Sequence, residues 1–259
     1  MGVYAAFTLW LVFTIFAGVG VYRMWAALGK PAWVNWALLP GTVVSEMAYI
    51  FGCLITGGEI QKAKLVPDAG NSGSGEPKTS ATPRWKFIGP IIASLIALVA
   101  SGAAILVLNH VLGQPVMEQF RLAVAEPLKQ ELPTTWDGLW IHLSDQLRIL
   151  RGICEMCPKL QWENWRVALF VYLAICLTVR LGPVSRPIHS TLGAAIAASA
   201  VIALIGVISG EQFTTLIKDI WPLLTFMWAS LMLLLVGTLI VCGLAALWKI
   251  LAGKDKGVK

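Results

Sequence analysis

The stretch from Phe87 to Leu112 reads FIGPIIASLIALVASGAAILVLNHVL and decides the fold class. It holds no Asp, Glu, Lys or Arg, and it is longer than the roughly 20 apolar residues that a helix needs to cross a bilayer. Five more apolar runs occupy roughly residues 3–28, 33–57, 165–181, 190–209 and 220–251. The sequence therefore predicts an all-α protein, a polytopic membrane helical bundle with about six transmembrane helices.

The composition indicates a membrane protein rather than a water-soluble one. Hydrophobic residues make up 57% of the chain, charged residues only 13%, and the mean hydropathy is +0.74. A soluble domain carries about 25% charged residues, so this chain could not cover a water-exposed surface. The net charge of +6 comes from basic residues scattered over loops and the C-terminal tail, without the basic surface that binds nucleic acid. The predicted partner is the lipid bilayer.

The loops divide the chain into three predicted parts. Residues 1–113 hold the first three transmembrane helices, and the Gly-, Ser- and Pro-rich stretch at 58–86 is predicted to be a flexible cytoplasmic linker. Residues 114–165 form an extracytoplasmic or interfacial segment. Within it, apolar side chains spaced by three and four residues from Trp136 to Leu150 predict an amphipathic helix. Residues 166–259 hold the last three transmembrane helices and a basic tail.

Lys and Arg residues set the predicted orientation, because cytoplasmic loops of membrane proteins are enriched in them. With six spans, one side carries 11 of the 20 basic residues, and the other carries 3 once the six in or beside the 114–165 segment are set aside. We therefore expect both termini in the cytoplasm. The first apolar run lacks the features of a cleaved targeting peptide, which favours a bacterial inner (plasma) membrane.

Glu46 is an acidic residue inside an otherwise apolar run. A carboxylate at the centre of a span costs about 2.5–3.5 kcal/mol on insertion scales, so Glu46 is a candidate functional residue. Ser45 and Tyr49 are four residues apart, and they share the helix face beside the acid. The alternative is a structural polar network, in which Glu46 pairs with Arg186 or with a backbone group.

The residues around Glu46 carry a resemblance to a known family. Pro40-Gly41-Thr42 is followed by Ser45-Glu46-Met47-Ala48-Tyr49 and then by Gly57-Gly58-Glu59-Ile60. This order resembles a subgroup of the site-2-protease-like intramembrane zinc metallopeptidases, in which Pro-Gly-Thr precedes H-E-x-x-H and a Gly-rich turn leads into a short strand. Two weaker likenesses lie at residues 84–90 and 172–193, so the resemblance loosely covers residues 33–195.

The resemblance implies a degenerate member of that family. Glu46 matches the family's Glu, but Ser45 and Tyr49 stand where the family has histidines. No Asp occurs where a later motif supplies the third ligand, and His189 is the nearest weak candidate for metal binding. Catalytic zinc needs about three protein ligands and an open position for water, and Ser and Tyr hydroxyls replace imidazoles poorly. We therefore expect no metal and no other cofactor, and no residue is confidently predicted to be catalytic.

Two further patterns leave alternatives open. Cys154 and Cys157 have C-x-x-C spacing, so they are either a disulfide or redox pair or ordinary loop cysteines. The run from Gly193 to Ala200 is rich in small residues, which lets helices approach closely. Its partner is either another helix of the same bundle or another protein.

The sequence is compatible with three functions. The first is a non-catalytic, pseudoprotease-like scaffold or subunit that binds a membrane-protein partner. The second is a membrane-embedded metallopeptidase with an altered metal site, and the third is a small transporter. Whether the protein is an enzyme stays open, although the replaced ligands favour a non-enzyme. A transporter is the weakest of the three, since a single buried acid and the lack of an inverted repeat define no path.

Overall fold

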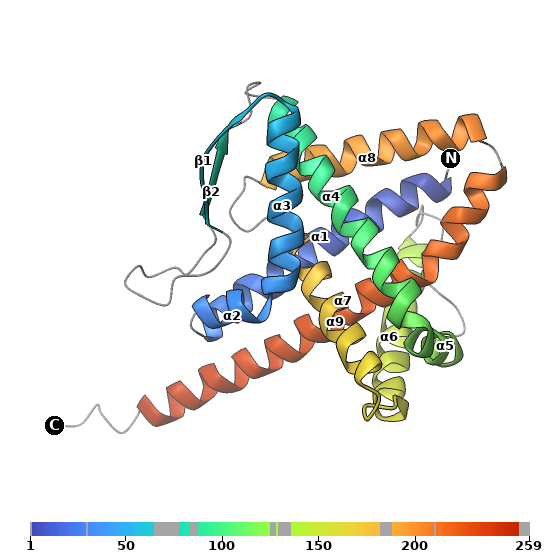
Figure 1. Cartoon of the computed structure of the whole chain (residues 1–259). Coiled ribbons are helices and arrows are strands. Elements are labelled where there is room, and N and C mark those ends of the chain that lie inside the picture. Colours follow the sequence, from blue (N-terminus) through green and yellow to red (C-terminus); the bar gives the residue numbers. More distant parts are fainter. Residues whose placement is uncertain are drawn as a thin grey trace.

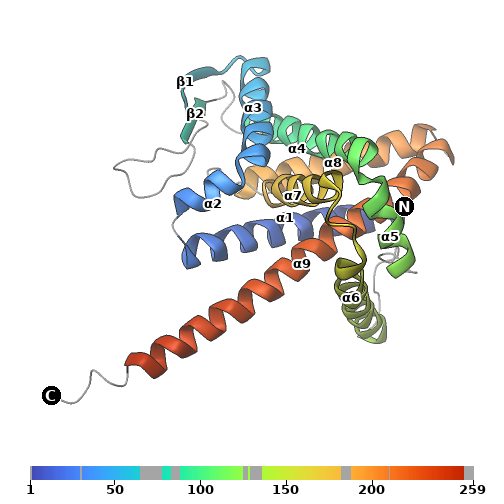
Figure 2. The same ribbon diagram turned by 60° about the horizontal axis from the view of Figure 1, so that its bottom comes forward.

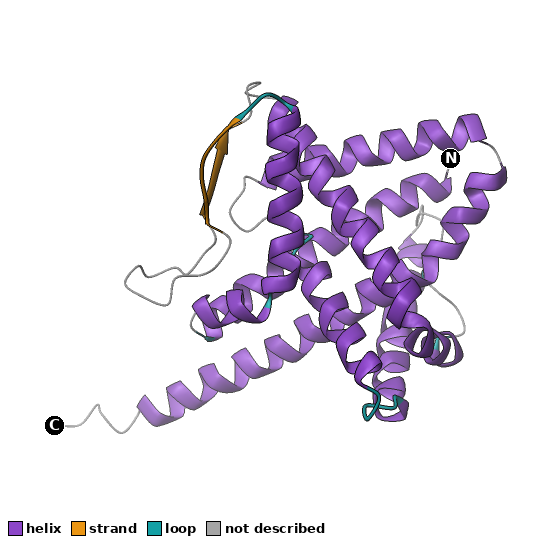
Figure 3. Ribbon diagram, in the orientation of Figure 1, coloured by secondary structure: helices purple, strands orange, loops and turns teal. Residues whose placement is uncertain are grey.

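The computed structural model describes residues 2–29, 31–64, 78–82, 88–124, 128, 136–181, 188–209 and 211–253. Helices make up nearly all of this part, and two short strands lie at its edge (Figures 1 and 3). The elements in chain order are α1 (Gly2–Leu28), α2 (Pro31–Ala37), α3 (Leu39–Ile55), β1 (Glu59–Lys64), β2 (Lys78–Thr82), α4 (Ile88–Leu108), the π-helical turn η1 (Asn109–Gly113), α5 (Gln114–Ala123), α6 (Trp136–Met156), the 3-10 turn η2 (Cys157–Lys159), α7 (Trp165–Val179), α8 (Ile188–Ser209) and α9 (Glu211–Gly253).

The predicted helical membrane fold is confirmed. In the described part, three helical stretches are long and apolar enough to cross a bilayer, namely Val3–Leu28, Ile88–Ala123 and Ile217–Leu244. The bent pair α2 and α3 makes a fourth if it counts as one span. The two other predicted spans correspond to shorter apolar helices, Trp165–Val179 and Ser190–Ile205. The 15 residues of α7 rise only about 22 Å, less than the roughly 30 Å of the hydrocarbon core.

Helices α1 and α9 run side by side in the same direction. The rings of Trp10 and Trp228 lie 5.3 Å apart, and further along both helices the Trp25 indole Nε1 donates to the Thr238 hydroxyl over 2.9 Å. The start of α1 and the end of α9 therefore lie at opposite ends of the bundle (Figures 1 and 2). The side of the membrane that each terminus faces is not shown by this packing, so the cytoplasmic location of both termini stays a prediction.

A β-hairpin follows α3 at the edge of the molecule. Gly57 has a φ of 69°, and the amides of Gly57 and Gly58 donate to the carbonyls of Leu54 and Cys53. This pair of hydrogen bonds forms a Schellman motif, which ends α3 and reverses the chain. Strands β1 and β2 then pair antiparallel, with Glu59 opposite Thr82. The ends of the predicted linker at 58–86 thus form strands, while residues 65–77 at its centre lie outside the described part.

Helix α6 lies where the helix from Trp136 to Leu150 was predicted and extends to Met156. One face is buried against the bundle through Ile149 and Ile153, and the Trp228 indole donates to the side-chain oxygen Oε1 of Gln146 over 2.5 Å. The other face exposes Trp136 and Trp140. Tryptophan at such positions is typical of the membrane–water interface.

The small residues of α8 pack inside the bundle. Ala194, Ala195 and Ala198 are buried, and a Cβ added to Gly193 would lie 3.3 Å from the side chain of Ile91 on α4. The structure therefore favours packing within the chain over docking of another protein for this row of small residues.

Candidate functional site

The site around Glu46 begins at a break in the second apolar run. Helices α2 and α3 meet at an angle of 81°, and Pro40 lies in the first turn of α3. Proline lacks an amide hydrogen and cannot donate to the preceding turn, so the run cannot continue as one straight helix. The Ala37 carbonyl at this break accepts a hydrogen bond from the Tyr172 hydroxyl over 2.7 Å and one from the Cys176 thiol over 3.4 Å. Helix α7 thereby holds the break from its side.

The next two residues fix α3 against α7. A Cβ on Gly41 would overlap the Cys176 carbonyl, so only glycine permits the two backbones to come this close. The Thr42 hydroxyl donates to the Leu38 carbonyl over 3.0 Å, which satisfies another polar group beside the break. Each residue of Pro40-Gly41-Thr42 therefore has a packing role that requires no metal chemistry.

Glu46 lies one turn further along α3 and is buried, at the start of a tightly packed seam that α3 forms with α4. Its side chain is 7% exposed. Tyr49 and Cys53 follow on the same face, and they form one buried cluster with Ala93 and Ala97 of α4. The buried face of α4 consists of small residues, namely Ala93, Ser94, Ala97 and Ser101. Small side chains let α3 and α4 approach closely.

The glycine at the end of this seam shows how closely the helices approach. A Cβ on Gly52 would lie 2.7 Å from the Cα of Ala93, well inside van der Waals contact. The side chain of Tyr49 is 9% exposed, and Ser45 is half-buried. The predicted trio of Ser45, Glu46 and Tyr49 is thus brought together on one helix, with two of its three side chains buried.

Two of the three histidines have side chains that the structure describes, and both lie on other elements than α3. In the part of the chain that the structure describes, no three side chains of His, Cys, Asp or Glu are grouped so that they could hold a metal ion. His110 lies exposed in η1, and the Nδ1 of His142 lies 2.9 Å from the Gly138 carbonyl on α6. His189 falls in the first turn of α8, but its side chain lies outside the described part. Arg186 lies entirely outside the described part.

Sequence reasoning missed a second buried polar cluster, formed by Tyr22, Asn35 and Arg180. The Oδ1 of Asn35 accepts a hydrogen bond from Arg180 Nη2 over 2.6 Å and one from the Tyr22 hydroxyl over 3.1 Å. The guanidinium carbon of Arg180 lies 4.7 Å from the centre of the Tyr22 ring, which is a cation–π contact. All three residues are buried: Tyr22 is 4% exposed, Asn35 1% and Arg180 4%. They join α1, α2 and the end of α7.

The only sequence signals for this cluster were a lone Asn in an apolar run and an Arg at the end of another. Asn35 and Arg180 are 145 residues apart, and no local pattern connects them. The cation also follows the last turn of α7, where the helix dipole favours positive charge.

Cys154 and Cys157 lie where α6 passes into η2, and both are free thiols in the structure. Cys154 is exposed and Cys157 is half-buried. Burial raises the pKa of the Cys157 thiol, and the neighbouring Cys154 raises it further. A raised pKa means less thiolate at neutral pH and hence a less reactive thiol. The predicted disulfide or redox pair remains a prediction.

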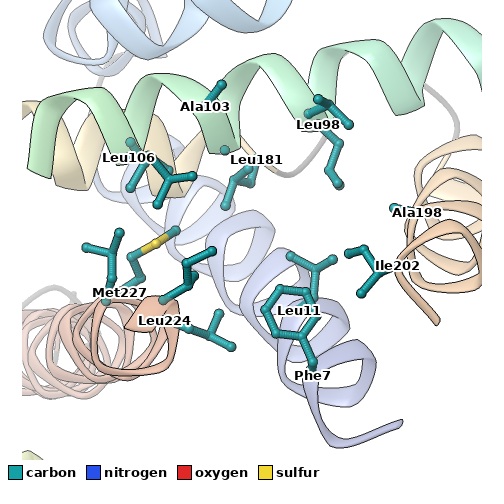
Figure 4. Close-up of a pocket in the computed structure, with 15 residues that line it drawn as sticks. Phe7, Leu11, Leu98, Ala103, Leu106, Leu181, Ala198, Ile202, Leu224 and Met227 are labelled. Atoms are coloured by element: carbon teal, nitrogen blue, oxygen red, sulfur yellow. The ribbon is translucent and has the colours of Figure 1, made fainter. Parts of the chain in front are cut away.

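A separate apolar pocket lies between α1, α4, α8 and α9 (Figure 4). Its volume is about 310 Å³, and every side chain that lines it is apolar. Leu11 of α1, Leu106 of α4, Ile202 of α8 and Met227 of α9 point toward the same space. The Glu46 site and this pocket share no lining residue.

Comparisons with known proteins add no relative. No protein-family model, no curated protein and no solved structure matches the chain. The class of protein is therefore set by the fold itself, which is that of a helical integral membrane protein.

Proposed function

We propose that this integral membrane protein is a non-catalytic relative of the site-2-protease-like metallopeptidases, and that it serves as a scaffold or subunit by binding a transmembrane helix of another protein. The residue types at the Glu46 site support the first half of this proposal. Hydrolysis catalysed by zinc needs about three protein ligands and an open position for water. In this chain the Ser45 hydroxyl and the Tyr49 phenol stand on either side of Glu46 in the motif.

The packing of α3 is the observation that carries the non-catalytic function. Pro40 and Gly41 fit α3 against α7, and Gly52 fits it against α4. The face that bears Glu46 and Tyr49 is buried against the small residues of α4. In this arrangement α3 serves as a tightly packed part of the bundle.

The second half of α9 is the surface that we assign to the partner. It extends away from the other helices in both views (Figures 1 and 2). Apolar side chains are exposed on several sides of it, namely Leu239, Ile240, Val241 and Leu244. Additional Cβ atoms at Gly237 and Gly243 would have nothing within 4 Å. Glycine exposed on a span permits a second helix to pack closely, so the partner is expected to be a membrane helix.

The test is affinity purification of the full chain from its native membrane in a mild detergent. We expect a membrane protein to co-purify at a fixed stoichiometry with the wild type. Gly237→Leu should lower its retention at least fivefold, because the new side chain separates the two helices. The matched control is Ala200→Leu, which adds the same side chain at an exposed small residue of α8.

Two outcomes would contradict the proposal. A homogeneous monomer without any co-purifying membrane protein would remove the scaffold function. Zinc bound at about one ion per chain, together with peptidase activity that Glu46→Gln abolishes, would instead establish a metallopeptidase with an altered metal site.

A further inference from the structure

The apolar pocket between α1, α4, α8 and α9 has a wall that no polar side chain interrupts. Leu11, Gly102, Leu106, Ile202, Leu224 and Met227 represent its four helices. A cavity lined only by such groups does not hold ordered water, because water needs two to four polar partners. A group that binds there must therefore be apolar, as a hydrocarbon chain is.

The pocket is continuous with the outer surface of α4. Val99 and Leu106 both line the pocket, and they are 58% and 41% exposed. Helix α4 belongs to a stretch that is long and apolar enough to cross a bilayer. Its exposed apolar face is therefore in contact with lipid chains, and the pocket is open to them without any polar barrier.

The narrowness of the pocket decides between a lipid chain and a protein helix. Leu223, Leu224 and Met227 line it from α9, yet they are only 3%, 5% and 8% exposed. An α-helix with its side chains is about 10–12 Å wide and cannot reach these buried side chains. A single flexible hydrocarbon chain can enter such a space from the side.

We propose that this pocket is a binding site for one acyl chain of a bilayer phospholipid. The chain enters between α4 and α9 and fills the space that the four helices leave open. Gly102 is the residue that keeps this space free, since a Cβ added there would have nothing within 4 Å. This site is independent of the partner surface on the second half of α9.

The experiment uses the full-length protein reconstituted in phosphatidylcholine that carries a photoreactive diazirine in the middle of one acyl chain. After irradiation and digestion, mass spectrometry gives the adduct yield at each helix. We expect adducts on the pocket-lining residues of α4 and α9, and Gly102→Leu should lower their yield at least fivefold. Gly102→Ala should give an intermediate value, because its side chain fills less of the pocket.

Two references make the result specific. Adducts at the exposed residues Met47 and Phe51 of α3 report contact with bulk lipid and should not change in any variant. Ala200→Leu adds the same side chain outside the pocket and should leave the yield at the pocket at the wild-type level. An unchanged ratio of pocket adducts to bulk adducts in Gly102→Leu would overturn the proposal.

A second measurement holds even if Gly102→Leu fails to fold. Native mass spectrometry of the wild type after prolonged detergent washing should show one retained phospholipid per chain. A fully delipidated protein of unchanged stability would overturn the proposal. So would a photoreactive residue at Leu106 that, in native membranes, cross-links to a protein side chain instead of a lipid.

Discussion

Replacing Asn35 by alanine tests the buried Tyr22–Asn35–Arg180 cluster most directly. The substitution removes an oxygen that accepts one hydrogen bond from a guanidinium and one from a phenol. A hydrogen bond to a charged group contributes about 1.5–3 kcal/mol, and a neutral one about 0.5–1.5 kcal/mol. Because Arg180 is 4% exposed, water cannot readily replace the lost acceptor. We expect Asn35→Ala to lower the free energy of unfolding by about 2–4 kcal/mol.

The assay is a reversible unfolding titration of the purified protein from a mild detergent into SDS, followed by Trp fluorescence. Tyr22→Phe should cost only about 0.5–1.5 kcal/mol, since the ring still faces the guanidinium. Asn35→Asp should retain most of the stability, because a carboxylate accepts from Arg180 and also compensates its charge. Gln161→Ala, at an exposed loop position, serves as the control. An Asn35→Ala protein within 0.5 kcal/mol of the wild type, or an Asn35→Asp protein as unstable as Asn35→Ala, would refute the assigned role of the cluster.

Three further predictions concern other contacts. Gly41→Ala should destabilise the protein by about 1–3 kcal/mol, because the new methyl group overlaps the Cys176 carbonyl. Thermal denaturation measures this effect, and the control is Gly243→Ala, whose added methyl group has no neighbouring atom within 4 Å. Tyr172→Phe should lower the unfolding free energy by about 0.5–1.5 kcal/mol through loss of the bond to the Ala37 carbonyl, and the same SDS titration measures it. Alkylation of Cys157 by iodoacetamide, followed by mass spectrometry, should reach half its maximal rate at a higher pH than alkylation of a peptide of the same local sequence. The reason is that burial raises the pKa of this thiol and only the thiolate reacts. The same pH of half-maximal rate in protein and peptide would contradict this.

The sequence was sufficient for the features that depend on local composition. The run from Phe87 to Leu112 indicated a membrane helix, and the structure has α4 there from Ile88 to Leu108. The spacing of apolar residues after Trp136 predicted α6, whose buried face carries Ile149 and Ile153. In each case the pattern lies within one segment, so helix periodicity alone reveals it.

Features that depend on pairing between distant segments could not be predicted. Nothing in the sequence connects Trp25 with Thr238, 213 residues away, and so the parallel course of α1 and α9 was missed. The pairing of Asn35 with Arg180 has the same origin. For Glu46, the sequence correctly indicated a polar group on an apolar helix, but only the structure shows that it is buried, on the face of α3 whose Tyr49 packs against α4.

The pairing of α1 with α9 has a consequence for biosynthesis. Helix α1 leaves the ribosome first, yet Phe7, Trp10 and Trp25 pack on residues that are translated more than 200 positions later. Until then, this aromatic face has to rest against lipid or the insertion machinery. A ribosome that stops before Trp221 leaves α1 without the helix that covers it, so this part of the bundle is assembled only after α9 has been made.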